Sequence, residues 1–141
     1  MTVGSALFKS NKHDWETPQF LFDGLNAEFK FNLDVCAVAE NAKCKEFFTP
    51  DDDGLSQDWG DAVCWVNPPY GRTIGHWMQK AFHSSRNGAT VVCLVPARTD
   101  TDWWHRFAMR GEIRFLRGRL KFVGADNSAP FPSAIVIFRP R

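Results

Sequence analysis

The sequence predicts an α/β protein with a mostly parallel sheet covered by helices on both faces. Apolar strand-like segments alternate with amphipathic helical segments along the 141 residues, and this alternation is typical of parallel sheets because a helix makes each crossover. The chain is 44% hydrophobic, which is enough for one packed core and excludes a disordered protein. We expect a loose polar lead-in over residues 1–12 and a single domain over residues 13–141.

Hydrophobic spacing predicts the elements in order. Leu21, Leu25 and Phe29 recur at helical intervals and predict a helix over 18–29. Ile74, Trp77, Met78, Ala81 and Phe82 share one face of a predicted helix over 73–86. A further helix is predicted over 100–110, and strands over 31–37, 46–49, 62–66, 89–95, 113–122 (a strand or a hairpin) and 133–138. Ligands of such sheets bind where the parallel strands end.

Composition excludes several classes of protein. No apolar run approaches the ~18 residues of a membrane helix, and the N-terminus has no signal-peptide pattern. We therefore expect a cytoplasmic protein without a membrane partner. The four cysteines lack the CxxC and paired-histidine spacings of zinc sites, so no metal is expected.

The charge is distributed unevenly along the chain. Residues 1–70 carry 5 Lys/Arg and 12 Asp/Glu, a net charge of −7, whereas residues 71–141 carry 12 and 4, a net charge of +8. The densest basic stretch is 114–121, with four cations in eight residues. A basic half favours an anionic partner, nucleic acid first, although the stretch 114–121 is equally compatible with a solvated strand face.

The residues Asn67-Pro68-Pro69-Tyr70 follow a predicted strand and are the best candidates for chemistry. Two prolines stop the strand and fix an extended turn. The side-chain oxygen of Asn67 and the backbone carbonyl of Pro68 can then accept the two hydrogens of an NH2 group, and the Tyr70 ring can stack on a planar base. Such a site could support positive charge that develops on the bound nitrogen.

This tetrapeptide resembles the signature of the amino-group methyltransferases that use S-adenosylmethionine. Thr17-Pro18, 33–37, 41–44, 53–55 and 66–72 together closely resemble the phage-type DNA N6-adenine methyltransferases of the Dam group. The resemblance spans about residues 13–138 and implies a compact Rossmann-like class I methyltransferase fold with an antiparallel C-terminal strand. It implies methylation of adenine N6 in double-stranded DNA by a phage or prophage enzyme, and GATC as the recognition site.

The resemblance also implies a set of cofactor contacts. S-adenosylmethionine would be bound by Thr17, Pro18, Asp34, Cys36, Ala37, Asp53, Leu55 and Asn67. The chain departs from the general amino-methyltransferase pattern because no glycine-rich turn follows its first strand. Backbone groups of Cys36 and Ala37 would then contact the cofactor, with Asp34 facing its amino group.

The target adenine has to leave the DNA stack to reach such a site. Tyr70 is the expected contact for one face of the base, and Phe122, with Phe131 as the alternate, for the opposite face or edge. Phosphate contacts are expected from Arg72, Arg98, Arg114, Arg117, Arg119 and Lys121.

Two other functions use the same features. The amino-methylation chemistry could act on protein glutamine or on RNA, but the basic C-terminal half favours DNA. The missing glycine-rich turn would also suit a degenerate methyltransferase fold that only binds DNA, but the intact tetrapeptide argues against this. The sequence leaves open whether the protein is a monomer or a homodimer.

Overall fold

A computed structural model describes residues 15–140 of the chain, so the lead-in predicted over residues 1–12 lies outside the described part. Its helices are α2 (Gln19–Phe29), α3 (Ile74–Arg86) and α4 (Asp102–Arg106), with 3-10 turns η1 (Gly54–Ser56) and η2 (Ala108–Arg110). Its strands are β1 (Leu33–Asp34), β2 (Val63–Val66), β3 (Thr90–Pro96), β4 (Glu112–Phe115) and β5 (Ser133–Phe138).

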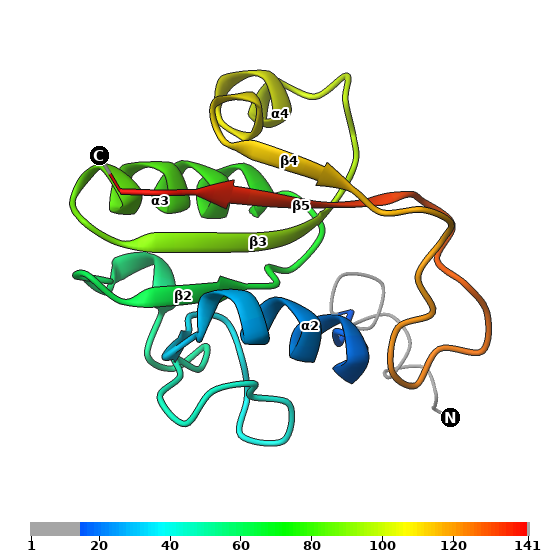
Figure 1. Cartoon of the computed structure of the whole chain (residues 1–141), viewed down its shortest axis with the longest axis horizontal. Coiled ribbons are helices and arrows are strands. Elements are labelled where there is room, and N and C mark those ends of the chain that lie inside the picture. Colours follow the sequence, from blue (N-terminus) through cyan, green and yellow to red (C-terminus); the bar gives the residue numbers. More distant parts are fainter. Residues whose placement is uncertain (1–14, 141) are drawn as a thin grey trace.

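The five strands form one sheet in the order β1-β2-β3-β5-β4 (Figure 1). β1, β2 and β3 are parallel, with Leu33 opposite Cys64 and Val66 opposite Cys93. β5 runs antiparallel to both β3 and β4. The predicted mixed sheet with an antiparallel C-terminal strand is therefore confirmed. The carboxyl ends of β1, β2 and β3 share one edge with the connection between β4 and β5.

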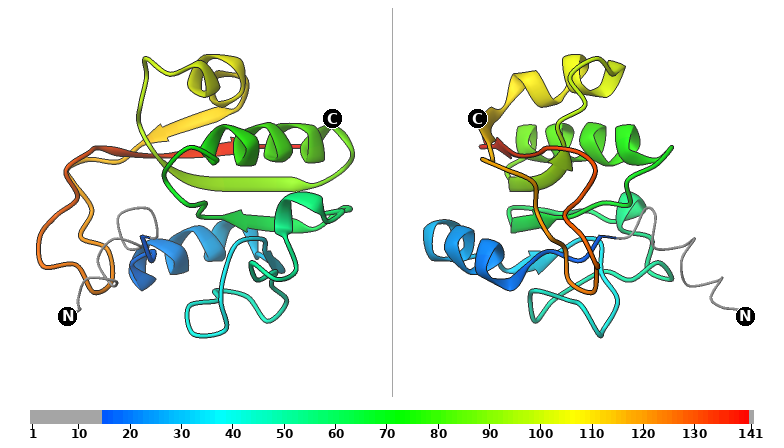
Figure 2. Two further views of the ribbon diagram at one scale, coloured as in Figure 1. Left: turned by 180° about the vertical axis from the view of Figure 1, so that it is seen from behind. Right: turned by 90° about the vertical axis from the view of Figure 1, so that its right-hand side faces the viewer.

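Helices cover both faces of the sheet, as the sequence predicts. α2 lies on one face, and α3 and α4 lie on the side of the other (Figure 2). The Phe22 ring of α2 meets Trp65 of β2 edge-on at a centroid distance of 5.4 Å. On the opposite face, Phe82 of α3 meets Phe138 of β5 at 5.9 Å.

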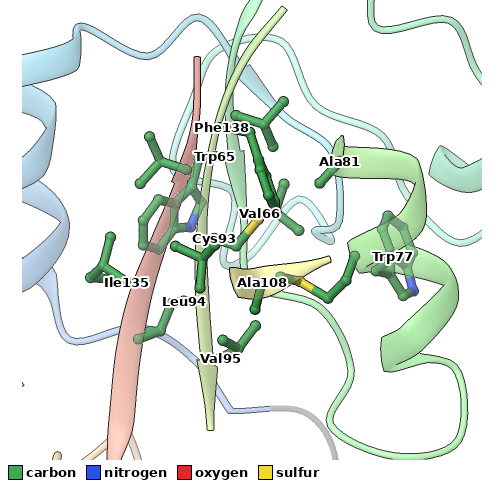
Figure 3. Close-up of a cluster of buried hydrophobic side chains, with 14 of the residues drawn as sticks. Trp65, Val66, Trp77, Ala81, Cys93, Leu94, Val95, Ala108, Ile135 and Phe138 are labelled. Atoms are coloured by element: carbon green, nitrogen blue, oxygen red, sulfur yellow. The ribbon is translucent and has the colours of Figure 1, made fainter. Parts of the chain in front are cut away.

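The core lies between these helices and the central strands. Side chains of β2, β3 and β5, among them Val66, Leu94 and Ile135, pack between α2 and α3 (Figure 3). Every residue of β3 after Thr90 is buried, as expected for a strand with both faces covered. The central strands are thus held rigidly, and the loops at their carboxyl ends have a fixed base.

The structure corrects four predicted boundaries. The strand predicted over 31–37 is reduced to β1, because the Asp34 carboxylate accepts backbone N–H groups of Cys36 and Lys43 and turns the chain. The segment 46–49 makes only an isolated bridge between Phe47 and Asp34. The helix predicted over 100–110 is interrupted at Phe107.

The fourth correction concerns the segment 113–122. The strand β4 ends at Phe115, and Gly118 then takes a φ of 76°, which favours glycine and carries the chain away from the sheet. Residues 116–132 consequently form a long loop at the carboxyl edge (Figure 1, orange). Among residues 15–140, no helix is long and apolar enough to cross a membrane.

Candidate active site

A cavity of about 220 Å³ opens at the carboxyl edge of the sheet. It is bounded by the segment before α2, the chain following β1, and the turn following β2. The predicted site residues that line it are Thr17, Asp34, Cys36, Ala37, Asn67, Pro68 and Pro69. Residues that lie 52 positions apart, such as Trp15 and Asn67, meet here.

The side-chain amide of Asn67 is held in one orientation. Its Nδ2 donates a hydrogen bond to the backbone carbonyl of Trp15, and a carbonyl oxygen can only accept. Its Oδ1 therefore points away from Trp15, and this buried atom has no hydrogen-bond partner among residues 15–140. A buried acceptor without a partner costs free energy, so a donor from a ligand would stabilise it.

Asp34 ends β1 and carries a buried carboxylate into the cavity. Desolvation by burial raises its pKa to about 6 from the ordinary 3.8, against the lowering effect of two backbone N–H donors. These donors are Lys43 N, 2.9 Å from Oδ2, and Cys36 N, 3.3 Å from Oδ1. A cationic ligand group would stabilise the ionised form further, as the positive charge of Lys43 already does.

Two further polar side chains belong to residues that line the cavity, Lys43 and Thr17. The Lys43 side chain is only 7% exposed, and its Nζ lies 2.9 Å from Gln19 Oε1 and 3.9 Å from Glu16 Oε2. The buried Thr17 Oγ1 has no hydrogen-bond partner within the described range 15–140. The cavity thus contains an anionic, a cationic and two neutral polar groups that a charged ligand could satisfy.

The acidic turn after residue 49 contributes backbone rather than carboxylates. Asp53 is exposed, and neither Asp53, Leu55 nor Pro18 is among the lining residues. Gly54 lines the cavity instead, and a Cβ there would lie 2.2 Å from the Val35 carbonyl oxygen. Only glycine allows this approach, which closes one wall of the cavity.

Tyr70 and Phe122 lie in an aromatic cluster with Trp15 and Phe131. Tyr70 is 5% exposed and Phe122 2%, and their ring centroids are 6.3 Å apart. Trp15 contacts Phe122 at 5.3 Å and Phe131 at 5.4 Å. The Tyr70 hydroxyl donates to the Leu94 carbonyl, and burial raises the pKa of this phenol well above its ordinary value. Stacking on a base would require an aromatic face to be uncovered.

The predicted phosphate-binding cations separate into two groups. Five of them are exposed on loops at the carboxyl edge: Arg72, Arg98, Arg117, Arg119 and Lys121. Arg114 is not available in the same way, because its guanidinium forms a bidentate pair with Glu28 at 2.7 and 2.8 Å and also pairs with Glu112. The sequence alone could not predict this ion pair, because Glu28 lies 86 residues from Arg114.

A fixed, buried acceptor beside a cavity with opposite charges, at the carboxyl edge of a parallel sheet, is the arrangement expected of an α/β enzyme that binds a polar ligand with an amino group. Comparison with known families makes this class specific. The DNA N-6-adenine-methyltransferase (Dam) family matches residues 4–140. The chain belongs to this family, and its activity is methylation of adenine N6 in DNA.

Two curated relatives agree with this assignment. The chain is 30% identical to the DNA N-6-adenine-methyltransferase of Haemophilus phage HP1 over 150 aligned positions, covering 100% of this chain and 87% of that protein. It is 36% identical over 63 positions to the putative methyltransferase YfdM of Escherichia coli K12, covering 40% of this chain and 69% of that protein.

Several cavity residues were missed by the sequence analysis. Lys43, Gly54 and Trp77 line the cavity, yet each belongs to a segment whose composition indicates only a loop or a core helix face. The signals for Lys43 and Gly54 were their places in the segments 41–44 and 53–55, which carry part of the family resemblance. Within residues 15–140, no three His, Cys, Asp or Glu side chains gather as a metal site.

Proposed function

We propose that this chain transfers the methyl group of S-adenosylmethionine to N6 of an adenine flipped out of duplex DNA. The observation that carries the proposal is the buried Oδ1 of Asn67, which has no partner in the part of the chain that the structure describes and is oriented by the Trp15 carbonyl. An exocyclic amino group is the donor that suits this position, because its second hydrogen can be accepted by the adjacent Pro68 carbonyl.

The polar groups of the cavity fit S-adenosylmethionine. Asp34 would accept from the ammonium of the methionine moiety, and Lys43 would pair with its carboxylate. Thr17 Oγ1, which is buried and has no partner among the residues that the structure describes, would gain a hydrogen bond with the cofactor. Backbone groups of Cys36 and Ala37 would replace the missing glycine-rich turn, and Gly54 would form part of the wall. When bound, the cofactor supplies an electrophilic methyl group on a sulfonium.

Asn67 and Pro68 perform the chemistry by positioning and charge stabilisation. Two accepted hydrogen bonds fix the plane of the amino group and direct its lone pair. As positive charge develops on N6, both oxygen dipoles stabilise it without reorganisation, because the amide and the proline turn are already fixed. The proton can leave for water after the nitrogen is alkylated, so no strong base is required.

The DNA would lie across the carboxyl edge, with its phosphates held by exposed cations on three loops. Arg72 follows the catalytic turn, Arg98 follows β3, and the remaining cations belong to 116–132. The Arg98 guanidinium lies 5.7 Å from the centroid of the Phe131 ring, at the rim of the aromatic cluster. We retain Tyr70 and Phe122 as walls of the target-base site, with movement within the cluster uncovering a ring face on base entry.

The test is methyl transfer from labelled S-adenosylmethionine to unmethylated duplex DNA, followed by modification-sensitive sequencing. Asn67→Ala is expected to reduce the single-turnover rate about a hundredfold, because an acceptor used in the transition state is removed. Asn87→Ala, an exposed change at the far end of α3, is the matched control. A normal rate for Asn67→Ala would refute the mechanism.

Two other outcomes would redirect the proposal. If RNA or a glutamine-containing peptide is methylated in preference to DNA, the acceptor is wrong and the amino-methylation chemistry remains. If calorimetry finds no binding of S-adenosylmethionine while DNA binds, the chain is a DNA-binding module and the proposed reaction is refuted.

A further inference from the structure

Trp15 is the residue that contacts both the catalytic amide and the basic loop. Its backbone carbonyl accepts a hydrogen bond from Asn67 Nδ2. Its ring lies against Phe122 and Phe131, two residues of the 116–132 loop. The neighbouring Glu16 carbonyl accepts from Val123 N at 3.0 Å. The start of the described chain and the 116–132 loop also lie side by side in both views of Figure 2.

We propose that Trp15 is a positioning residue that couples the 116–132 loop to the orientation of the Asn67 amide. This inference rests on the proposed function. The ring of Trp15 is anchored on the loop, and its carbonyl is the hydrogen-bond acceptor for the amide nitrogen of Asn67. The position of the loop therefore sets the position of the acceptor atom.

The charges on the loop give this coupling a functional direction. Arg117, Arg119 and Lys121 are exposed on the loop, whereas Phe122 next to them is buried against Trp15. DNA phosphates would bind the three cations and restrain the chain that carries Phe122. The same restraint would pass through the Trp15 ring and carbonyl to Asn67, so DNA on the loop would favour the aligned amide.

Asn67 follows β2 and precedes two prolines, and its side-chain amide needs a contact from elsewhere in the chain to fix its rotation. The prolines fix the backbone but do not determine the rotation of the Asn67 side chain. A rotated amide would present Nδ2, a donor, to the amino group of the substrate and would repel it. One hydrogen bond to Trp15 selects the productive rotation, and displacements of the reacting groups by about 1 Å can cost a hundredfold in rate.

The test is a double-mutant cycle between Trp15 and Asn67, read as single-turnover rates at saturating DNA and S-adenosylmethionine. Trp15→Ala is expected to lower the rate of the otherwise unchanged protein about tenfold or more. In the Asn67→Ala background it should change the rate less than twofold, because the amide that Trp15 positions is absent. Trp15→Phe, which keeps a ring on the loop, should restore most of the rate.

A purely structural role for Trp15 would lower the rate by the same factor in both backgrounds, and equal factors would overturn the proposal. Phe20→Ala is the matched control, since this aromatic side chain is 73% exposed on α2 nearby. If Trp15→Ala fails to fold, Phe131→Leu, which weakens the other ring contact between Trp15 and the loop, replaces it in the cycle. Absence of methyl transfer by the unchanged protein would refute the proposed function instead.

Discussion

The Tyr70 hydroxyl provides a prediction that separates packing from catalysis. Tyr70→Phe removes one buried hydrogen bond, from the hydroxyl to the Leu94 carbonyl at 3.0 Å, and keeps the ring against Phe131. The loss of a buried hydrogen bond costs about 1–2 kcal/mol of unfolding free energy. Methyl transfer should stay within about twofold of the unchanged protein, because the lost hydroxyl bonds to β3 and the variant keeps the ring that would contact the target base.

Urea unfolding, followed by circular dichroism, measures the unfolding free energy of Tyr70→Phe and of the unchanged protein. The two values are compared with the same dependence of free energy on urea concentration. Tyr70→Ala is the contrasting variant, with an expected loss of about 3–5 kcal/mol because a buried ring is removed. An unfolding free energy of Tyr70→Phe within about 0.3 kcal/mol of the unchanged protein would refute the structural role of the hydroxyl. A tenfold loss of activity would instead place the hydroxyl in the reaction.

Three further predictions concern the cavity and the DNA surface. Gly54→Ala should abolish S-adenosylmethionine binding in calorimetry, since its Cβ would meet the chain after β1 at 2.2 Å; retained binding would contradict the close approach. Burial raises the pKa of Asp34 in the folded protein to about 6, so this group's contribution to stability is fully present below about pH 4 and is lost as the pH rises through 6. The affinity for the cationic cofactor should rise over the same range, because the Asp34 carboxyl becomes ionised. Calorimetry from pH 5 to 8 should show this rise, and Asp34→Asn should remove it. Neutralising Arg117 and Arg119 should reduce the slope of log affinity for DNA against log salt by about 0.9 for each phosphate that these side chains neutralise, whereas Arg114→Gln should leave the slope unchanged.

Elements with a strong local pattern were predictable from the sequence. β5 occupies 133–138 as expected, and the five apolar residues assigned to one face of α3 are all buried. In both segments the spacing of apolar residues matches the period of the element, so local and tertiary preferences agree. The catalytic turn was equally visible, because a strand that ends in two prolines has few structural alternatives.

Features that depend on distant partners were not predictable. Arg114 has the local appearance of a phosphate-binding residue, but Glu28 on α2 occupies its guanidinium. Lys43 lies in a polar loop segment, and only the folded chain shows that its ammonium is buried. The prediction of Asp53 as a cofactor contact stays untested, and the structure brings the neighbouring Gly54 to the cavity because close approach there excludes a side chain.

The 116–132 loop has a consequence for how the proposed DNA-binding surface could be altered. The Ala129 N–H donates to the Leu120 carbonyl at 2.7 Å, which closes residues 121–128 at their base. The strands β4 and β5, which flank the 116–132 loop, are paired with each other over four positions. The tip of the loop can therefore be exchanged between relatives as a cassette, with the sheet left intact, provided that the aromatic residue at 122 is kept. Chimeras of this kind would show whether the tip of this loop determines which DNA sequence is methylated.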